Sequence, residues 1–147
     1  MNIDNLNKKI LKCLQQNARQ SNAEIGREVG ISSPAVSERI KKMEDFGVIE
    51  DYKTLVSPFD LGYQFKAIIT LRAFMGKLKP FLEKVKTYDE VINCYRITGD
   101  ENIVMEVVLK DQKHLEKFID QLIIYGESKT QIVLSRVVKQ KEIKPVE

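Results

Sequence analysis

Hydrophobic residues recur at helical spacing in three series over the first 46 residues of the chain. The first series comprises Ile3, Leu6, Ile10 and Leu14, the second Ile25 and Val29, and the third Val36, Ile40, Met43 and Phe46. Residues three or four positions apart lie on one face of a helix. The pattern therefore predicts three short helices that pack into a small bundle between residues 4 and 46.

Capping signals separate the second and third of these helices. Ser21 and Glu24 form a capping box, in which each side chain accepts a hydrogen bond from the backbone amide of the other residue. Gly30 suits a left-handed position after the second helix, and Gly47 stops the third. Gly26 is small enough to let the two helices approach closely. Two short helices joined by a glycine turn predict a helix-turn-helix unit, whose second helix binds in the major groove of double-stranded DNA.

The residues at the start of the third helix and off its apolar stripe are the candidates for contact with DNA. They are Ser32, Ser33, Pro34, Ala35, Ser37, Glu38, Arg39, Lys41 and Lys42. We expect the cations to contact phosphates or bases, and the serine and glutamate side chains to reach base edges. An ordinary helical hairpin with a solvated face would carry similar charges. The capping residues, the small Gly26 and the turn glycine Gly30 all occur at the spacing that a helix-turn-helix unit requires, and this coincidence favours DNA binding.

The periodicity changes in the second half of the chain. We expect a helix-turn-helix domain over residues 1–50, an extended connector over residues 51–63 and a second domain over residues 64–147. The second domain has predicted strands at 64–72, 90–98, 102–110 and 130–138, with helices starting near 78 and 112. This order of elements is that of a ferredoxin-like βαββαβ unit, so the fold class is α+β. Apolar residues on the face of the sheet that the helices leave uncovered predict dimerisation through that face.

Composition narrows the range of functions. The chain has 147 residues, 43% of them hydrophobic and 31% charged, and its net charge of +3 permits nucleic-acid binding without requiring it. No apolar run approaches the roughly 20 residues that span a bilayer. The N-terminus has no apolar signal-peptide core, so we expect a cytoplasmic protein that does not bind membranes.

Candidate chemistry is sparse. Cys13 and Cys94 are too few and too far apart for a zinc site or a disulfide framework. The single histidine, His114, lies in a charged helical segment and has no recognisable catalytic partner. The chain also has no phosphate-binding glycine loop. We therefore predict no metal site, no cofactor and no enzymatic activity.

Four segments in this order resemble the Lrp/AsnC (feast/famine) family of transcriptional regulators. They are DNLNKKILKCLQQNARQSNAEIGREVGISSPAVSERIKKMEDFGVIEDY, SPFDLG, CYRITGDENIVMEVVLKD and TQIVLSRVVK. The resemblance implies an N-terminal helix-turn-helix domain and a C-terminal ferredoxin-like domain that dimerises. It further implies that dimers assemble into octamers or related rings, and that an amino acid bound between dimers modulates transcription.

The resemblance also implies an effector site around the turn after the second strand and around the last strand. The corresponding residues are Arg96, Thr98, Gly99, Asp100, Asn102, Gln131, Ile132 and Val133. The family pattern at the turn is Gly-Asp-hydrophobic-Asp, whereas this chain has Glu101 and Asn102 in the last two positions. Arg96 stands where many relatives have an apolar residue. These departures argue against a plain hydrophobic effector such as leucine.

The sequence leaves two classes of function open. The first is a sequence-specific DNA-binding regulator that responds to an amino acid. The second is a small-molecule sensor or interaction module that has no direct role on DNA and keeps its helical domain for assembly. RNA binding through the sheet ranks below both, because Tyr95 is the only aromatic residue in the second and third predicted strands.

Overall fold

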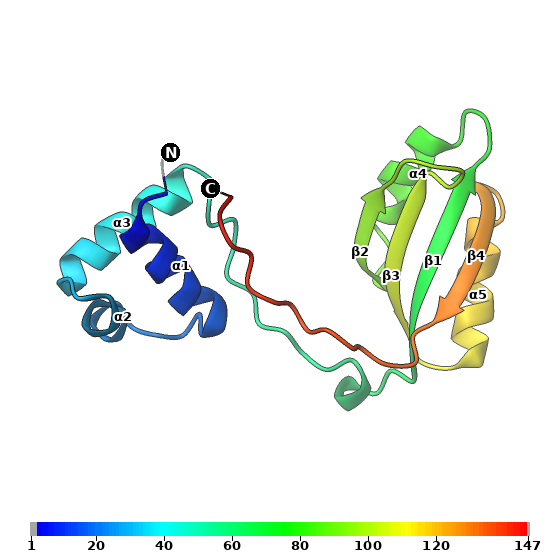
Figure 1. Cartoon of the computed structure of the whole chain (residues 1–147). Coiled ribbons are helices and arrows are strands. Elements are labelled where there is room, and N and C mark those ends of the chain that lie inside the picture. Colours follow the sequence, from blue (N-terminus) through cyan, green and yellow to red (C-terminus); the bar gives the residue numbers. More distant parts are fainter. Residues whose placement is uncertain (1–2, 147) are drawn as a thin grey trace. The chain divides into compact units, whose positions relative to one another are not determined.

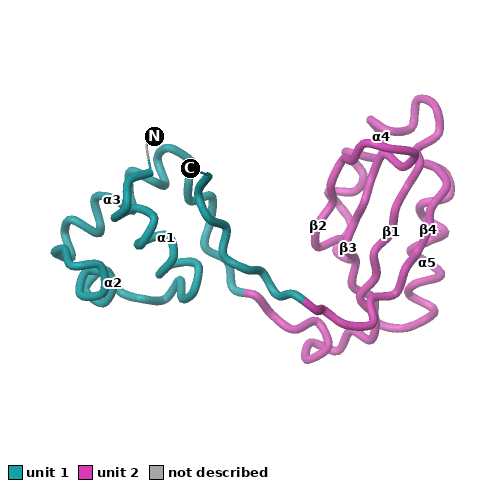
Figure 2. The backbone as a smooth tube through the Cα atoms, in the orientation of Figure 1, with its two compact units in different colours: residues 1–54, 138–147 teal, residues 55–137 magenta. Residues whose placement is uncertain are grey.

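The computed structural model describes residues 3–146 and contains two compact units. One unit comprises residues 1–54 and 138–147 and the other residues 55–137 (Figure 2). The first holds three helices, α1 (Asn5–Gln16), α2 (Asn22–Val29) and α3 (Ser33–Asp45). Contacts thus group residues 138–147 with the helices, whereas the sequence analysis placed them in the second domain.

Each of the three helices begins after a capping residue, and the predicted capping box of α2 is among these caps. Asp4 Oδ1 accepts a hydrogen bond from the Asn7 amide at 2.8 Å, at the start of α1. The capping box of α2 has both of its hydrogen bonds, at 2.7 and 3.2 Å. Gly30 follows α2 with a φ of 80°, a backbone conformation that favours glycine. These local signals explain why the helices begin and end where they do.

The helical unit is built around a small apolar core. Its buried members are Ile10, Cys13, Ile25, Val29, Val36 and Met43. Phe46 does not join this core, although the sequence analysis placed it on the apolar stripe of the third helix. It is 66% exposed, because α3 ends at Asp45 and the chain turns away at Gly47, whose φ is 69°.

The second unit contains a four-stranded antiparallel sheet and two helices (Figure 1). Its elements are the 3-10 helix η1 (Phe59–Leu61), β1 (Phe65–Ala73), α4 (Leu78–Val85), β2 (Val91–Arg96), β3 (Ile103–Leu109), α5 (Gln112–Leu122) and β4 (Gly126–Ile132). The strand order is β2-β3-β1-β4. Phe81 of α4 and Phe118 of α5 pack into one core with the inward side chains of β1 and β3. The predicted ferredoxin-like arrangement is confirmed.

The position of the last strand differs from the prediction. The sequence predicts a strand over residues 130–138, but β4 runs from Gly126 to Ile132. An added Cβ at Gly126 would lie 2.2 Å from the carbonyl oxygen of Arg72, so the close pairing of β4 with β1 requires glycine there. Most of the apolar residues on which the prediction was based lie beyond the end of the strand. Two of them, Leu134 and Val137, are over 90% exposed.

The face of the sheet opposite α4 and α5 has a mixed composition. Ile68 pairs with Glu106 and Thr70 with Val104 in the register of β1 and β3, and these side chains share that face. Lys66 Nζ lies 3.3 Å from Glu106 Oε1, in a half-buried ion pair. The face is therefore not the apolar surface that the sequence analysis expected, because charged residues alternate with apolar ones along β1 and β3.

Substituting Gly26 by alanine tests the packing between α2 and α3. An added Cβ would lie 2.5 Å from the carbonyl oxygen of Ile31 in the turn between the helices. Alanine favours a helix over glycine by roughly 0.5–1 kcal/mol, whereas overpacking costs about 1–3 kcal/mol. We expect Gly26→Ala to lower the free energy of unfolding, measured by urea denaturation. A more stable variant would contradict the close approach.

Candidate functional site

The exposed face of α3 brings five predicted DNA-contacting residues together. Pro34, Ser37, Glu38, Lys41 and Lys42 are all exposed, and their spacing places them on one side of the helix. The opposite side carries the buried Val36 and Met43. α3 therefore presents a continuous polar face while its apolar face holds it on the bundle.

The remaining candidates at the start of α3 differ in accessibility, and Ser32 is exposed whereas the other two are not. Ser32 is the N-cap, and its hydroxyl oxygen accepts a hydrogen bond from the Ala35 amide at 3.4 Å. Ser33 and Ala35 are half-buried. Pro34 has no amide hydrogen and the Ala35 amide already binds the Ser32 hydroxyl, so two of the first three residues of α3 offer no free backbone amide.

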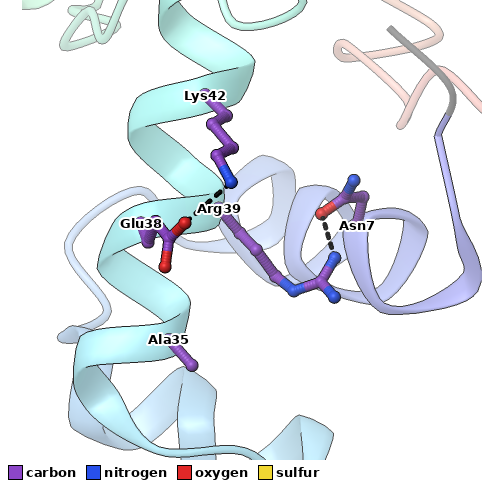
Figure 3. A pocket seen from close by; sticks show the side chains of 5 residues that line it. All are labelled: Asn7, Ala35, Glu38, Arg39 and Lys42. Atoms are coloured by element: carbon purple, nitrogen blue, oxygen red, sulfur yellow. Dashed lines mark hydrogen bonds and ion pairs between the residues drawn. The ribbon is translucent and has the colours of Figure 1, made fainter.

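Arg39 connects α3 to α1 instead of standing free. Its Nη1 atom donates to Asp4 Oδ2 at 2.7 Å and to Asn7 Oδ1 at 3.0 Å (Figure 3). Asn7 is only 3% exposed, so its amide oxygen obtains a partner that burial would otherwise deny it. Arg39 therefore helps to set the position of α3 relative to α1. The sequence analysis missed Asn7 because it counted only apolar residues toward the core.

A hollow of about 300 Å³ lies between α1 and α3, beside this contact (Figure 3). Its lining residues are Asn7, Ala35, Glu38, Arg39 and Lys42. Lys42 Nζ lies 2.7 Å from Glu38 Oε1, one helical turn away on α3, and both side chains are mostly exposed. An exposed pair of this kind contributes little to stability. A phosphate can compete with Glu38 for Lys42 at little cost.

The start of the connector is held to the end of α3. The Tyr52 hydroxyl donates to Glu44 Oε1 at 2.8 Å. Burial, with the nearby Glu44 carboxylate, raises the pKa of Tyr52 to about 12, so the hydroxyl keeps its proton at neutral pH. Residues 50–56 contain no strand, so the extended connector that the sequence predicts does not pair with another strand there.

The predicted effector residues around the first hairpin lie in an exposed turn between β2 and β3. Thr98, Gly99 and Asp100 are exposed, and Gly99 has a φ of 113°. Arg96 ends β2 and is exposed as well. The turn therefore presents a carboxylate and a guanidinium to solvent within a few residues of each other.

Asn102 has a structural role at the base of this turn. Its Oδ1 atom accepts a hydrogen bond from the Ala73 backbone amide at 2.8 Å, and the backbone amide of Asn102 donates to the Leu71 carbonyl at 2.9 Å. The side chain thereby ties the hairpin to the end of β1. One lone pair of its side-chain oxygen is engaged in this way, and the other lone pair and the two side-chain amide hydrogens of Asn102 remain to offer a ligand.

β4 supplies charged residues near the turn that the sequence analysis missed. Lys129 Nζ lies 2.6 Å from Glu101 Oε1. This hydrogen bond to Glu101 raises the pKa of Lys129, and the charge of Asp100 adds to the effect. Arg72 of β1 lies 3.6 Å from Glu127 in the same region. The register of β4 with β1 brings these residues together. The sequence analysis did not find them because it placed the fourth strand too late in the chain.

The structure does not bring all predicted effector residues together within one chain. The turn lies beside the end of β1, where Asn102 binds Ala73. Ile132 pairs with Ala67, six residues earlier in β1, and Val133 donates to the Lys66 carbonyl. At about 3.3 Å per residue, the two groups lie roughly 20 Å apart. A site that used both groups would have to take them from different chains.

Residues 3–146 contain neither a cluster of potential metal ligands nor a helix that could span a membrane. No group of three or more potential ligands from histidine, cysteine, aspartate and glutamate occurs there. No helix in that part of the chain is long and apolar enough to cross a bilayer. His114, which was expected to be a lone surface residue, accepts a hydrogen bond from the Lys110 amide at Nδ1, and its Nε2 lies 2.9 Å from Glu90 Oε1.

The Asp4 carboxylate allows a pH-dependent test of the contact between α1 and α3. The Asn7 amide, and then Arg39, hold the pKa of Asp4 below its ordinary value of 3.8. A lowered pKa means that the stabilisation is present above pH 3.8 and is lost as the pH falls through the folded-state pKa. Asp4→Asn keeps a good N-cap but removes the charge. We expect it to lower the melting temperature at pH 7, with a difference from wild type that shrinks in acid. A difference independent of pH would contradict the ion pair.

Comparisons with known families agree with this arrangement of sites. Residues 3–44 match the AsnC-type helix-turn-helix domain, and residues 66–143 match the Lrp/AsnC ligand binding domain. The first match contains α1, α2 and nearly all of α3. The second contains the whole sheet unit after the connector and extends into the C-terminal tail.

The chain is also similar to individual proteins over most of its length. The chain is 37% identical over 121 residues to the HTH-type transcriptional regulator Ptr1 of Methanocaldococcus jannaschii, which covers 82% of each protein. It is similar to the structure of LrpC from Bacillus subtilis, with a TM-score of 0.90, 26% identity and coverage of 95% and 100%. The complex of the Neisseria meningitidis transcriptional regulator NMB0573 with L-Met has a TM-score of 0.90, 25% identity and coverage of 97% and 96%. The chain belongs to the Lrp/AsnC family of transcriptional regulators, with a helix-turn-helix DNA-binding domain and a ligand-binding domain.

Proposed function

We propose that α3 is the recognition helix and that its exposed face binds operator DNA. The observation that carries this proposal is the exposed face formed by Ser37, Glu38, Lys41 and Lys42. Arg39 does not belong to this face, because its side chain binds Asp4 and holds α3 against α1. Lys41 and Lys42 bind phosphates or bases, and Ser37 and Glu38 contact base edges, where a glutamate can accept a hydrogen bond from cytosine. Arg39 acts by positioning the helix.

Removing the two lysines tests this assignment. Each phosphate contact that is lost makes the dependence of log affinity on log salt less steep by roughly 0.9. We expect Lys41→Ala combined with Lys42→Ala to weaken binding and to flatten the salt dependence, measured by fluorescence anisotropy on a fragment of the protein's own promoter. Lys113→Ala with Lys117→Ala on α5 is the control of equal charge, and it should leave the slope unchanged. An unaltered salt dependence of binding in the Lys41→Ala, Lys42→Ala variant would show that neither lysine contacts DNA.

An amino acid is the proposed effector, and the turn between β2 and β3 is its proposed site. The relative from Neisseria is known as a complex with L-Met. Here Asp100 can accept the α-ammonium group, and Arg96 can bind a carboxylate with its planar donors. Gln131, Ile132 and Val133 contribute from a neighbouring chain, because their own chain holds them far from the turn.

A site completed by a second chain requires assembly, and we infer that the chain forms dimers that associate further. The uncovered face of the sheet carries the half-buried Lys66–Glu106 pair beside Ile68 and Val104, and Tyr95 on it is 56% exposed. A second sheet packed against this face would bury the apolar members, while the ion pair would require matched partners. A symmetric dimer also places two recognition helices for half-sites about one helical turn of DNA apart.

Light scattering of the purified protein tests the effector and the assembly together. We expect a mass of several chains, near eight for an octamer, that shifts when one amino acid is added. L-methionine is the first to try, followed by the other common amino acids. Asp100→Asn should abolish the shift without changing the mass of the unliganded protein. A dimer that responds to none of them would contradict effector-controlled assembly.

The remaining parts of the proposal follow from the family. The relatives are named as transcriptional regulators, which supports a non-catalytic role for this chain without a cofactor. A regulator of this kind works in the compartment that holds the chromosome. In archaea and bacteria, the source of these relatives, that compartment is the cytoplasm. The alternative role, a sensor that does not bind DNA, has no feature in the structure that favours it over the exposed face of α3.

A further inference from the structure

The C-terminal tail, residues 138–146, groups with the DNA-binding unit although it follows the ligand-binding sheet. The match to the ligand-binding domain extends to residue 143, yet contacts assign the tail to the unit that holds α1, α2 and α3 (Figure 2). The tail lies on the surface of that unit, and Ile143 is 82% exposed. The chain therefore crosses twice between the two units, once through the connector and once between Val137 and Val138. The second crossing begins where β4 ends.

One side chain fastens the tail to the helices. Gln15, in the last turn of α1, donates from Nε2 to the Ile143 carbonyl at 3.1 Å, and its Oε1 accepts from the Ile143 amide at 2.8 Å. An amide side chain is a donor and an acceptor at once, so it can satisfy both backbone groups of one residue, like a rung of an antiparallel ladder. A carboxylate or an apolar side chain of similar length cannot do so.

Position in the chain connects this contact to the proposed effector site. β4 carries Lys129, whose ammonium group binds Glu101 of the effector turn. Three residues later β4 ends, and the amide of Val133 makes a last hydrogen bond to Lys66 before the tail begins. Nine residues separate Val133 from Ile143. They form no helix or strand, so a short irregular segment links the end of β4 to the contact with α1.

We propose that the docked tail is a second tether that couples the ligand-binding sheet to the DNA-binding helices, with Gln15 as its anchor on α1. The proposal rests on the function proposed above, because it needs both DNA binding and an effector. The tether limits the orientations open to the helical unit. Such pre-organisation lowers the entropy that is lost when two recognition helices bind DNA. Through the tether, a change in the position of β4 on effector binding is transmitted to α1.

Gln15→Met removes both hydrogen bonds while keeping an unbranched side chain that suits a helix. Gln16→Met is the matched control, because Gln16 is the next residue of α1, is equally exposed and makes no hydrogen bond to the tail among the described residues. The first readout is hydrogen exchange of C-terminal peptides, measured by mass spectrometry. We expect the Ile143 amide to exchange roughly five-fold faster in Gln15→Met only. Rapid exchange of the Ile143 amide in the wild-type protein would show that the tail is not docked on α1.

The second readout is affinity for a promoter fragment, with and without L-methionine or whichever amino acid shifts the wild-type protein. We expect Gln15→Met to bind DNA roughly three- to ten-fold more weakly and to respond less to the amino acid, with Gln16→Met unchanged. Faster exchange of the Ile143 amide in Gln15→Met, together with an unaltered affinity for DNA and an unaltered response to the amino acid, would overturn the coupling. A wild type that binds no DNA refutes the proposed function instead, and the exchange comparison still decides whether the tail is docked.

Discussion

The contact of Arg39 with Asp4 and Asn7 is the interaction on which the DNA-binding unit depends. The apolar core of this unit is small, and α1 and α3 contribute only a few buried side chains each. A guanidinium that bridges the cap of one helix and a buried amide of that same helix adds the directional contact that apolar packing lacks. It leaves the outer face of α3 free for a partner. Arg39 therefore holds α3 in position, and its neighbours on the exposed face remain available for the proposed contacts with DNA.

The sheet unit follows a similar division of roles. Side chains that point toward α4 and α5 are buried and apolar, whereas those on the other face and in the turn between β2 and β3 are charged or half-exposed. Antiparallel pairing sets which of these charges meet. Because β4 pairs with β1 from Gly126 onward, Lys129 lies beside the turn, and Gln131 to Val133 lie at the far end of the sheet. The register therefore implies that a ligand site using both groups belongs to an assembly of chains.

Local signals in the sequence were enough to predict the helices and the class of fold. The capping box at Ser21, the left-handed Gly30 and the N-cap Ser32 all act within a few residues, and the structure has each of them. Features that depend on distant residues were not predictable in this way. Nothing near Arg39 in the sequence indicates that it binds Asp4, 35 residues earlier. The fourth strand was misplaced because the apolar run after Thr130 resembles a strand more closely than the polar segment that forms it. The same apolar residues leave the sheet and lead into the tail that docks on Gln15.

The central claim is that this chain regulates transcription by binding DNA directly through α3. The measurement that tests it most directly is a mobility-shift titration of the purified full-length protein with a fragment of its own promoter, against unrelated DNA of the same length as competitor. The account predicts a retarded complex that survives an excess of the competitor and weakens as the salt concentration rises. A protein that shifts neither fragment, or shifts both with equal affinity, would contradict sequence-specific recognition by α3.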